Sequence, residues 1–449
     1  MLKKTVSIAF FLLVFSLQFA NAAAKPAEQI DLAGDLFGAP YRIRVPENWN
    51  GTLLIYAHGY RDRADHPGEV DNRAAEVAPS AALEPVFLAQ GYALAGSAYR
   101  NNGWAVEEGI EDIKNLTLFF NSNVGTPQYT ILWGFSMGSV ITFESMEQYA
   151  NLYDGALAGC AVGAGSSRSW DASGDLALAY DKLFGMPASW GTPGNVRDDL
   201  DFETEVQPKL TAEVSNPANF PKFEFIRLVT GTPGRGIVPP APPNFYPGWV
   251  FTDMFFTTEA RAELERRARG PVVRNIDHNY DLTDTEKAYL VSLGVPATVI
   301  EGWLASLNLE RIIFPPFYSR FYLSRNADYS GDIQAPVLTL HTLYDPLVTV
   351  TQEREYLDTV KKAGRTNFLY QTYTNGNGHC NFTGEQLVAS VTAINNWVRT
   401  QTKPTAANFP TSLGFLPDSF VPPPMNQPRL DSKPQLLDFK FSNTGLKRK

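Results

Sequence analysis

Residues 129–138 read Tyr-Thr-Ile-Leu-Trp-Gly-Phe-Ser-Met-Gly, and the prediction of the fold starts from them. Its first half is rich in β-branched and aromatic residues and predicts a buried strand, whereas residues 139–149 continue as a helix. A Gly-x-Ser-x-Gly pentapeptide between a strand and a helix forms a sharp turn that lifts the serine hydroxyl above the sheet. The pentapeptide also recurs by chance, but the strand before it and the helix after it favour Ser136 as a nucleophile.

Strand and helix patterns alternate on both sides of a long irregular region. Strands are expected at 52–57, 92–98, 130–133, 156–162, 337–341 and 368–373, and helices at 106–120, 351–363 and 384–399. Buried strands that alternate with helices predict a mostly parallel sheet flanked by helices, the α/β class. Residues 166–330 are rich in Pro, Gly and aromatic residues. By its position, this region is expected to be an inserted lid over the site, with one helix opened by a capping box of Thr283 and Glu286.

A serine nucleophile needs a base, and the base needs an orienting acid. The chain has five histidines. Of these, His379 follows a predicted strand in a Gly/Asn-rich loop, and Asp345 ends the preceding strand. Both positions fall at the carboxyl edge of a parallel sheet, where ligands bind in such folds. We therefore expect Ser136, Asp345 and His379 to be catalytic. Asp345 could instead be a turn residue before Pro346, and the weaker candidates for the acid, Asp332 and Asp358, lie away from a strand end.

Four motifs carry a resemblance to a known family: Ala57-His-Gly-Tyr60, Gly134-Phe-Ser-Met-Gly138, Tyr344-Asp-Pro-Leu-Val348 and Gly378-His-Cys-Asn-Phe-Thr383. Over about residues 30–165 and 330–400 the chain resembles secreted bacterial α/β-hydrolases of the esterase/lipase type. The resemblance implies an α/β-hydrolase fold with an oxyanion hole formed by the backbone N–H groups of Tyr60 and Met137, and His58 is expected to brace that turn.

The implied reaction is hydrolysis of a small-molecule carboxylic ester through an acyl-enzyme intermediate. A peptidase or amidase on the same fold is the alternative, because amide and ester cleavage use the same catalytic groups. A catalytically inactive binding protein is a third interpretation, since fold does not determine function. We expect no cofactor and no metal, because the sequence contains neither metal-ligand spacing nor a phosphate-binding Gly-rich loop. The oligomeric state is left open.

The two cysteines allow two interpretations. In the tannase- and feruloyl-esterase-like relatives, a cysteine after the histidine bridges to one beside the serine. This sequence departs from that pattern, because Phe135 precedes Ser136. Cys160 and Cys380 could still form a disulfide at the carboxyl edge of the sheet. The alternative is two buried thiols that act as small hydrophobic groups.

The chain has 449 residues and a formal net charge of −9, which argues against a nucleic-acid partner. Lys3 and Lys4, an apolar run over 6–19 and Ala20-Asn-Ala22 predict a cleaved signal peptide. We therefore expect export to a bacterial periplasm or exterior, and a mature chain without a membrane span. The expected division is a leader at 1–22, core at 23–165, lid at 166–330, core at 331–403 and a Pro-rich C-terminal extension at 404–449.

Three smaller expectations concern side chains in the lid and the extension. The aromatic clusters at 245–246, 249–251 and 254–256 line an acyl or aryl pocket or form the core of the lid itself. The charged helix at 258–269, with Glu259, Glu263 and Glu265 among several arginines, is expected to be a solvated face with i,i+4 ion pairs. The extension, with Phe409, Phe415, Phe420 and Phe439, is expected to pack on the body.

Overall fold

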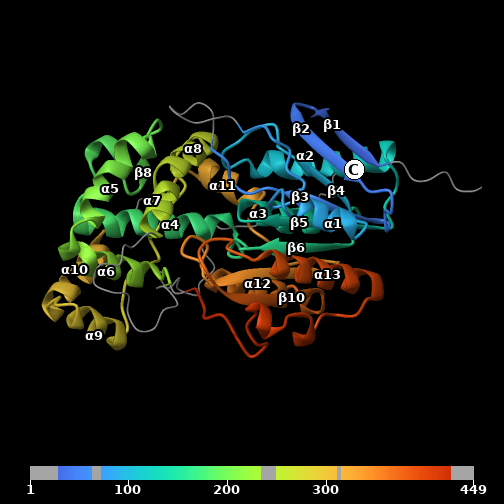
Figure 1. Ribbon diagram of the computed structural model, residues 1–449. Helices are drawn as coiled ribbons and strands as arrows, with labels where there is room; N and C mark the ends of the chain where they lie inside the picture. The colour runs from blue at the N-terminus through green and yellow to red at the C-terminus, as the bar shows by residue number, and fades with distance from the viewer. Residues whose placement is uncertain (1–28, 63–71, 234–248, 311–314, 426–449) are drawn as a thin grey trace, which may run out of the picture.

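A computed structural model describes residues 29–62, 72–233, 249–310 and 315–425 (Figure 1). The proposed leader at 1–22 lies outside these residues, as does the aromatic pair at 245–246. In the part of the chain that is described, no helix has both the length and the apolar character needed to cross a membrane.

An eight-stranded sheet with the order β1-β2-β4-β3-β5-β6-β9-β10 forms the centre of the fold. Its strands are β1 Ile30–Leu36, β2 Ala39–Val45, β3 Thr52–Ala57, β4 Ala93–Ser97, β5 Tyr129–Phe135, β6 Gly155–Gly159, β9 Val337–Tyr344 and β10 Leu369–Asn377. Pairing is antiparallel between β1 and β2 and between β2 and β4, and parallel elsewhere. The sequence patterns missed the β1–β2 hairpin, because β1 is mostly exposed and lacks a buried apolar run.

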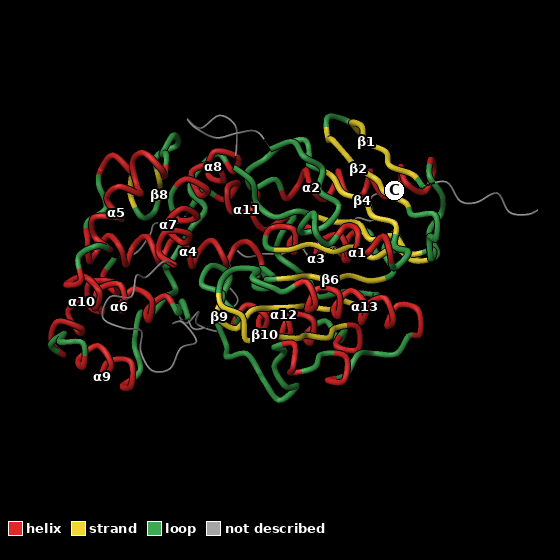
Figure 2. The backbone as a smooth tube through the Cα atoms, viewed as in Figure 1, coloured by secondary structure: helices red, strands yellow, loops and turns green. Residues whose placement is uncertain are grey.

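Both faces of this sheet are covered by helices (Figure 2). Along β3, Leu53 and Ile55 pack into a core shared with α2 and α3, whereas Leu54 and Tyr56 pack into a core shared with α1 and α13. The bounds of these helices are α1 Glu84–Ala89, α2 Val106–Asn123, α3 Met137–Gln148 and α13 Gly384–Thr400, and α12 Thr351–Lys362 also joins the first core. Successive side chains of a strand point to opposite faces, so a strand buried on both faces reads as a continuous apolar run.

The segment between β6 and β9 is mostly helical and lies at the opposite end of the molecule from β1 and β2 (Figure 1). It contains α4 Gly165–Phe184, α5 Gln207–Val214, α6 Phe220–Thr230, α7 Trp249–Thr257, α8 Glu259–Ala268, α9 Asp284–Ser292, α10 Ala297–Leu309, α11 Phe317–Arg325 and the short pair β7 Gly191–Thr192 and β8 Asn195–Val196. The helices α4, α5, α6, α7, α9 and α10 contribute to a hydrophobic cluster of their own, whereas α8 and α11 pack into the core that the sheet shares with α2 and α3. The predicted capping box is present, since Thr283 and Glu286 each accept from the other's backbone N–H at the start of α9.

Helix α8 is buried, so the predicted solvated face is wrong. The charged side chains with little exposure are Glu259, Arg261, Glu263 and Glu265. Glu263 Oε2 accepts the backbone N–H of Trp104 at 2.8 Å, and Glu259 Oε2 accepts that of Phe202 at 2.7 Å. The i,i+4 pairs do occur, between Arg261 and Glu265 and between Glu263 and Arg267. The charges are tolerated inside because each carboxylate accepts a hydrogen bond from a neighbouring segment.

The described part of the C-terminal extension packs on the body, as predicted. Phe409 and Phe415 are buried in the core beneath α13, and Phe415 forms a β-bridge with Thr374 of β10. Phe420 contacts the ring of Tyr373 edge-on at a centroid distance of 4.9 Å. Phe439 lies outside the described residues.

Candidate active site

Ser136 occupies a strained turn between β5 and α3. Its φ of 56° and ψ of −125° lie in a region that residues other than glycine rarely adopt. The flanking glycines have a steric reason. A Cβ at Gly134 would lie 2.3 Å from the carbonyl oxygen of Gly138, and a Cβ at Gly138 would lie 2.1 Å from that of Ala57. The strand–serine–helix turn predicted from residues 129–138 is therefore present, and only glycine fits on either side.

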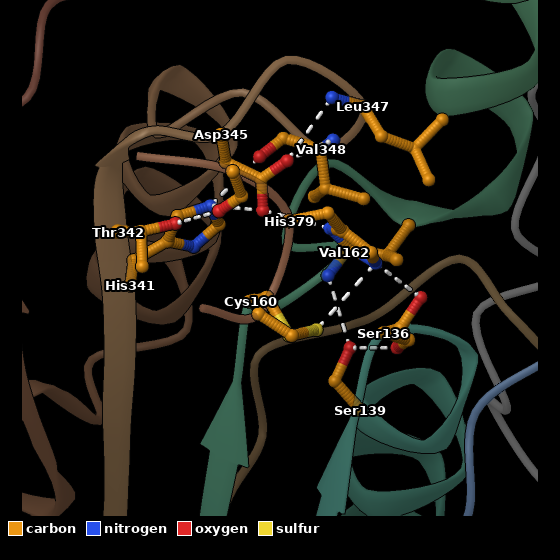
Figure 3. The surroundings of a disulfide bond; sticks show 12 residues. Ser136, Ser139, Cys160, Val162, His341, Thr342, Asp345, Leu347, Val348 and His379 are labelled. Carbon is orange, nitrogen blue, oxygen red and sulfur yellow. Dashed lines mark hydrogen bonds and ion pairs between the residues drawn. A yellow bond between two sulfur atoms is a disulfide. The ribbon is translucent and has the colours of Figure 1, made fainter. Parts of the chain in front are cut away.

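The three residues expected to be catalytic lie in one hydrogen-bonded line (Figure 3). Ser136 Oγ is 2.7 Å from His379 Nε2, and His379 Nδ1 is 2.8 Å from Asp345 Oδ2. Asp345 is fully buried just beyond β9, and its other oxygen, Oδ1, accepts the backbone N–H groups of Leu347 and Val348 at 3.0 and 2.9 Å. These bonds hold the carboxylate in place, so that it can orient the imidazole ring toward the serine.

The two weaker candidates for the acid lie elsewhere. Asp332 pairs with Arg365 and Asp358 pairs with Arg354, and both carboxylates are about half exposed. The carboxylate that is hydrogen-bonded to His379 is that of Asp345.

His341 on β9 is fully buried and lies close to Asp345. Its Nε2–H donates to the carbonyl oxygen of Val348 at 2.8 Å, its Nδ1 lies 3.1 Å from Glu353 Oε1, and its Nε2 lies 3.8 Å from Asp345 Oδ2. Although burial by itself lowers the pKa of His341, the hydrogen bond and charge of Glu353 and the charge of Asp345 raise it overall. The sequence predicted His341 at the end of a strand, but no sequence pattern indicated that it contacts Glu353, which lies 12 residues later.

Cys160 and Cys380 form a disulfide, which decides between the two interpretations of the cysteines (Figure 3). Their Cα atoms are 5.1 Å apart. Cys160 directly follows β6, and its φ of 42° ends the strand at Gly159, short of the predicted end at Val162. The bridge joins the loop that carries His379 to the strand next to β5.

The turn expected to supply the oxyanion hole lies against Ser136. A Cβ at Gly59 would be 3.5 Å from Ser136 Cβ. His58 is buried, donates from Nδ1–H to the carbonyl oxygen of Gly59 at 2.7 Å, and stacks on Tyr99 at 3.9 Å, so it braces the turn as predicted. Burial, followed by the charge of Arg61, lowers the pKa of His58 to about 3, and the ring is therefore neutral at physiological pH.

A pocket beside Ser136 has an open space of about 820 Å³, which includes its mouth. Trp170 of α4, Phe256 of α7 and Leu347 of the loop after β9 contribute to its lining. Of the predicted aromatic clusters, Phe256 therefore lines the pocket, whereas Trp249 and Phe251 pack on the core of the inserted segment. Asp253 also lines the pocket, and the sequence patterns did not indicate it as a site residue. The available signal was a single carboxylate in the otherwise uncharged sequence Trp-Val-Phe-Thr-Asp-Met-Phe-Phe-Thr.

Two groups of described residues are close enough together to share a metal ion: Cys160, His379 and Cys380, and Asp201, Glu203 and Glu259. In the first group the two sulfurs are joined in the disulfide and are not thiolate ligands. In the second group Asp201 Oδ1 accepts from the backbone N–H of Thr204, and Glu259 Oε2 accepts from that of Phe202. These two carboxylates therefore have structural roles in capping local backbone.

No protein-family model matches the chain. It is 23% identical to an o-phthalyl amidase of Xanthobacter agilis in an alignment of 422 residues, which covers 80% of this chain and 85% of that relative. Similar solved structures include feruloyl esterase B from Aspergillus oryzae, with a TM-score of 0.45, 12% identity and coverage of 84% of this chain and 82% of that one. Proline iminopeptidase from Mycobacterium smegmatis has a TM-score of 0.38, 12% identity and coverage of 83% and 100%.

The fold is identified by features of the chain itself. The central sheet is mostly parallel, helices cover both of its faces, and a sharp turn connects β5 to α3 through Ser136. Asp345 and His379 follow β9 and β10, the strands at one side of the sheet. The chain has the α/β-hydrolase fold.

Proposed function

We propose that the chain is a serine hydrolase that cleaves carboxylic esters through an acyl-enzyme intermediate, with Ser136, His379 and Asp345 as its catalytic residues. The observation that carries this proposal is the 2.7 Å hydrogen bond between Ser136 Oγ and His379 Nε2, made by a serine at a positive φ. A strained serine beside a base that is held by a buried acid matches the requirements of nucleophilic catalysis.

The reaction follows from these positions. His379 Nε2 takes the hydroxyl proton as Ser136 Oγ attacks the ester carbonyl carbon, and Asp345 stabilises the resulting imidazolium. The backbone N–H groups of Tyr60 and Met137 donate to the oxyanion, an effect that contributes several kcal/mol in comparable sites. His379 then protonates the departing alcohol, and water cleaves the acyl-enzyme by the same steps in reverse order.

Amide hydrolysis is the second candidate, and the relative named as an amidase favours it. The catalytic groups are the same, but the leaving group is an amine, which must be protonated before it departs. The positions of Ser136, His379 and Asp345 are compatible with either reaction. An experiment must therefore distinguish an alcohol from an amine leaving group.

We further propose that residues 166–330 act as a lid and that the protein is exported. The lid proposal is supported by the pocket, since α4 and α7 of the inserted segment contribute residues to its wall beside Ser136. Export is supported by the disulfide, because such bonds persist in oxidising compartments.

Covalent labelling and a matched substrate pair test the function. A fluorophosphonate probe should label Ser136 of the wild type and leave Ser136→Ala unlabelled, as read by peptide mass mapping. p-Nitrophenyl butyrate and butyric p-nitroanilide differ only in the atom that leaves, and we expect the ester to be cleaved faster. Turnover of the anilide alone would favour the amidase. A folded wild type that is neither labelled nor active would refute the proposal.

A further inference from the structure

Asp253 is a buried carboxyl group in the wall of the pocket that contains Ser136. It is 6% exposed and lies on α7, whose other pocket-lining residues are Phe256 and Thr257. Its Oδ1 atom is buried without a hydrogen-bond partner among the described residues. Leaving a buried carboxyl oxygen without a partner costs free energy. The unpaired oxygen of Asp253 therefore points to a ligand that supplies the missing partner.

The rest of the pocket wall indicates the chemical class of that ligand. Among the described lining residues Asp253 is the only one with an ionisable side chain, and none is Lys, Arg or His. Aromatic rings stand in the same wall. The ring centroids of Trp104 and Trp170 are 5.0 Å apart, and those of Trp170 and Phe256 are 6.5 Å apart. A carboxylate accompanied by aromatic rings is the combination that binds ammonium groups, through charge and cation–π attraction.

We propose that Asp253 is a specificity-determining residue and that it binds a positively charged ammonium group of the substrate. This assignment rests on the proposed hydrolase function, because it places the cation in the pocket where Ser136 attacks the acyl group. The same wall disfavours substrates with a carboxylate, since none of the described lining residues is a cation that could offset that negative charge.

Binding of a cation at this position is coupled to a proton. Burial, and then the charge of Asp345 beyond the end of β9, raise the pKa of Asp253 well above its usual range. Its carboxyl group therefore keeps its proton to a higher pH than an exposed carboxyl group does. A permanently charged quaternary ammonium pairs with the carboxylate, so the O–H bond of Asp253 breaks on binding and the proton passes to the buffer.

Three esters of matched shape test the charge preference. They are p-nitrophenyl 5-(trimethylammonio)pentanoate, the uncharged p-nitrophenyl 6,6-dimethylheptanoate and the p-nitrophenyl monoester of hexanedioate. We expect kcat/KM to be at least tenfold higher for the cationic ester than for the uncharged one, and lowest for the anionic one. In Asp253→Asn, which keeps the shape and removes the charge, the cationic-to-uncharged ratio should fall at least fivefold.

Glu224→Gln is the matched control. Glu224 is a buried carboxylate of the inserted segment that pairs with Arg227 and is not among the residues lining the pocket, so its variant should keep the wild-type ratio. A cationic ester that is no better than the uncharged one in the wild type overturns the proposal. So does an unchanged ratio in Asp253→Asn.

Calorimetric binding of butyltrimethylammonium separates this proposal from the hydrolase function, because it needs no turnover. Titrations in buffers of different ionisation enthalpy should show binding to the wild type with proton release, and at least tenfold weaker binding to Asp253→Asn without it. No binding to the wild type, or equal binding to both proteins, overturns the assignment. Failure of Ser136 labelling alongside Asp253-dependent binding would instead refute only the hydrolase function.

Discussion

Cys380, the residue after His379, is bonded to Cys160, which lies 220 residues earlier in the sequence. Cys380 Sγ is 3.5 Å from His379 Nε2, the atom that faces Ser136 Oγ. Because Cys160 follows β6 and Ser136 follows the adjacent strand β5, the bridge ties the loop carrying the proposed base to the part of the sheet that carries the proposed nucleophile.

Removal of the bridge should reduce both stability and activity. In the double variant Cys160→Ala/Cys380→Ala the loop at 378–383 loses its attachment to the end of β6, so His379 lies beside Ser136 less often. We expect a loss of about 2–5 kcal/mol in the free energy of unfolding and at least a tenfold loss in kcat. Urea unfolding and ester hydrolysis measure the two effects. The single variants serve as controls, and each should lose about as much as the double variant, whereas full activity of the double variant would contradict this role.

Asp345→Asn should abolish most of the activity without unfolding the protein. The amide keeps the shape of the acid but does not stabilise the imidazolium, and a change of this kind in a Ser-His-Asp triad lowers kcat by about 10⁴-fold. Steady-state kinetics with a p-nitrophenyl ester measure the effect. Asp358→Asn removes an exposed carboxylate that pairs with Arg354, and it should keep the wild-type rate. Equal losses in both variants would exclude Asp345 as the specific orienting acid.

His58 should make the protein sensitive to acid. Its pKa is lowered to about 3 in the folded state by burial and then by Arg61, compared with about 6.5 in an unfolded chain. The unfolded state therefore binds the proton more readily, so the stabilisation is present above about pH 6.5 and is lost as pH falls toward 3.

The variant His58→Gln retains a hydrogen-bond donor but does not titrate. Between pH 6.5 and pH 4 the free energy of unfolding of the wild type should fall by roughly 3 kcal/mol more than that of the variant, at about 1.4 kcal/mol per pH unit. Denaturant unfolding at several pH values provides the comparison. Parallel pH profiles of the two proteins would show that His58 is not the group responsible.

Glu263→Ala should weaken the attachment of α8 to the core. The carboxylate accepts the N–H of Trp104 and pairs with Arg267, so its loss leaves both groups without that partner in a buried position. We expect a loss of about 3–5 kcal/mol, measured by unfolding in denaturant. The exposed Glu203 provides the control, and Glu203→Ala should change stability by less than about 0.5 kcal/mol. An equally small loss of stability in both variants would show that Glu263 does not attach α8 to the core.

Much of the fold could be predicted because its signals are local. The run from Tyr129 to Gly138 encodes strand, turn and helix through backbone sterics. The capping boxes of Thr283 with Glu286 and of Thr383 with Gln386 mark the starts of α9 and α13 through hydrogen bonds that span three residues. The grouping of Ser136, Asp345 and His379 could also be predicted, because the carboxyl ends of parallel strands meet at one edge of the sheet.

Other features depend on contacts between distant segments. The charged sequence of α8 is typical of a solvated helix, and only the backbone N–H groups of Trp104 and Phe202, brought to it by the fold, make its burial favourable. In the sequence, nothing distinguishes Asp253 from other acidic residues on helices. It lies in the pocket wall only because α7 packs beside α4.

Local signals in the sequence were therefore enough to predict most of the alternating strands and helices of the core, the turn at Ser136 and the chain order of the proposed catalytic residues. Each follows from steric and hydrogen-bonding preferences within a few residues. Tertiary contacts were needed to establish that Cys160 is bonded to Cys380, that His341 and Glu353 lie next to Asp345, and that Asp253 lines the pocket. These relationships join residues from different elements, and their energies arise from burial and pairing that exist only once the chain has folded.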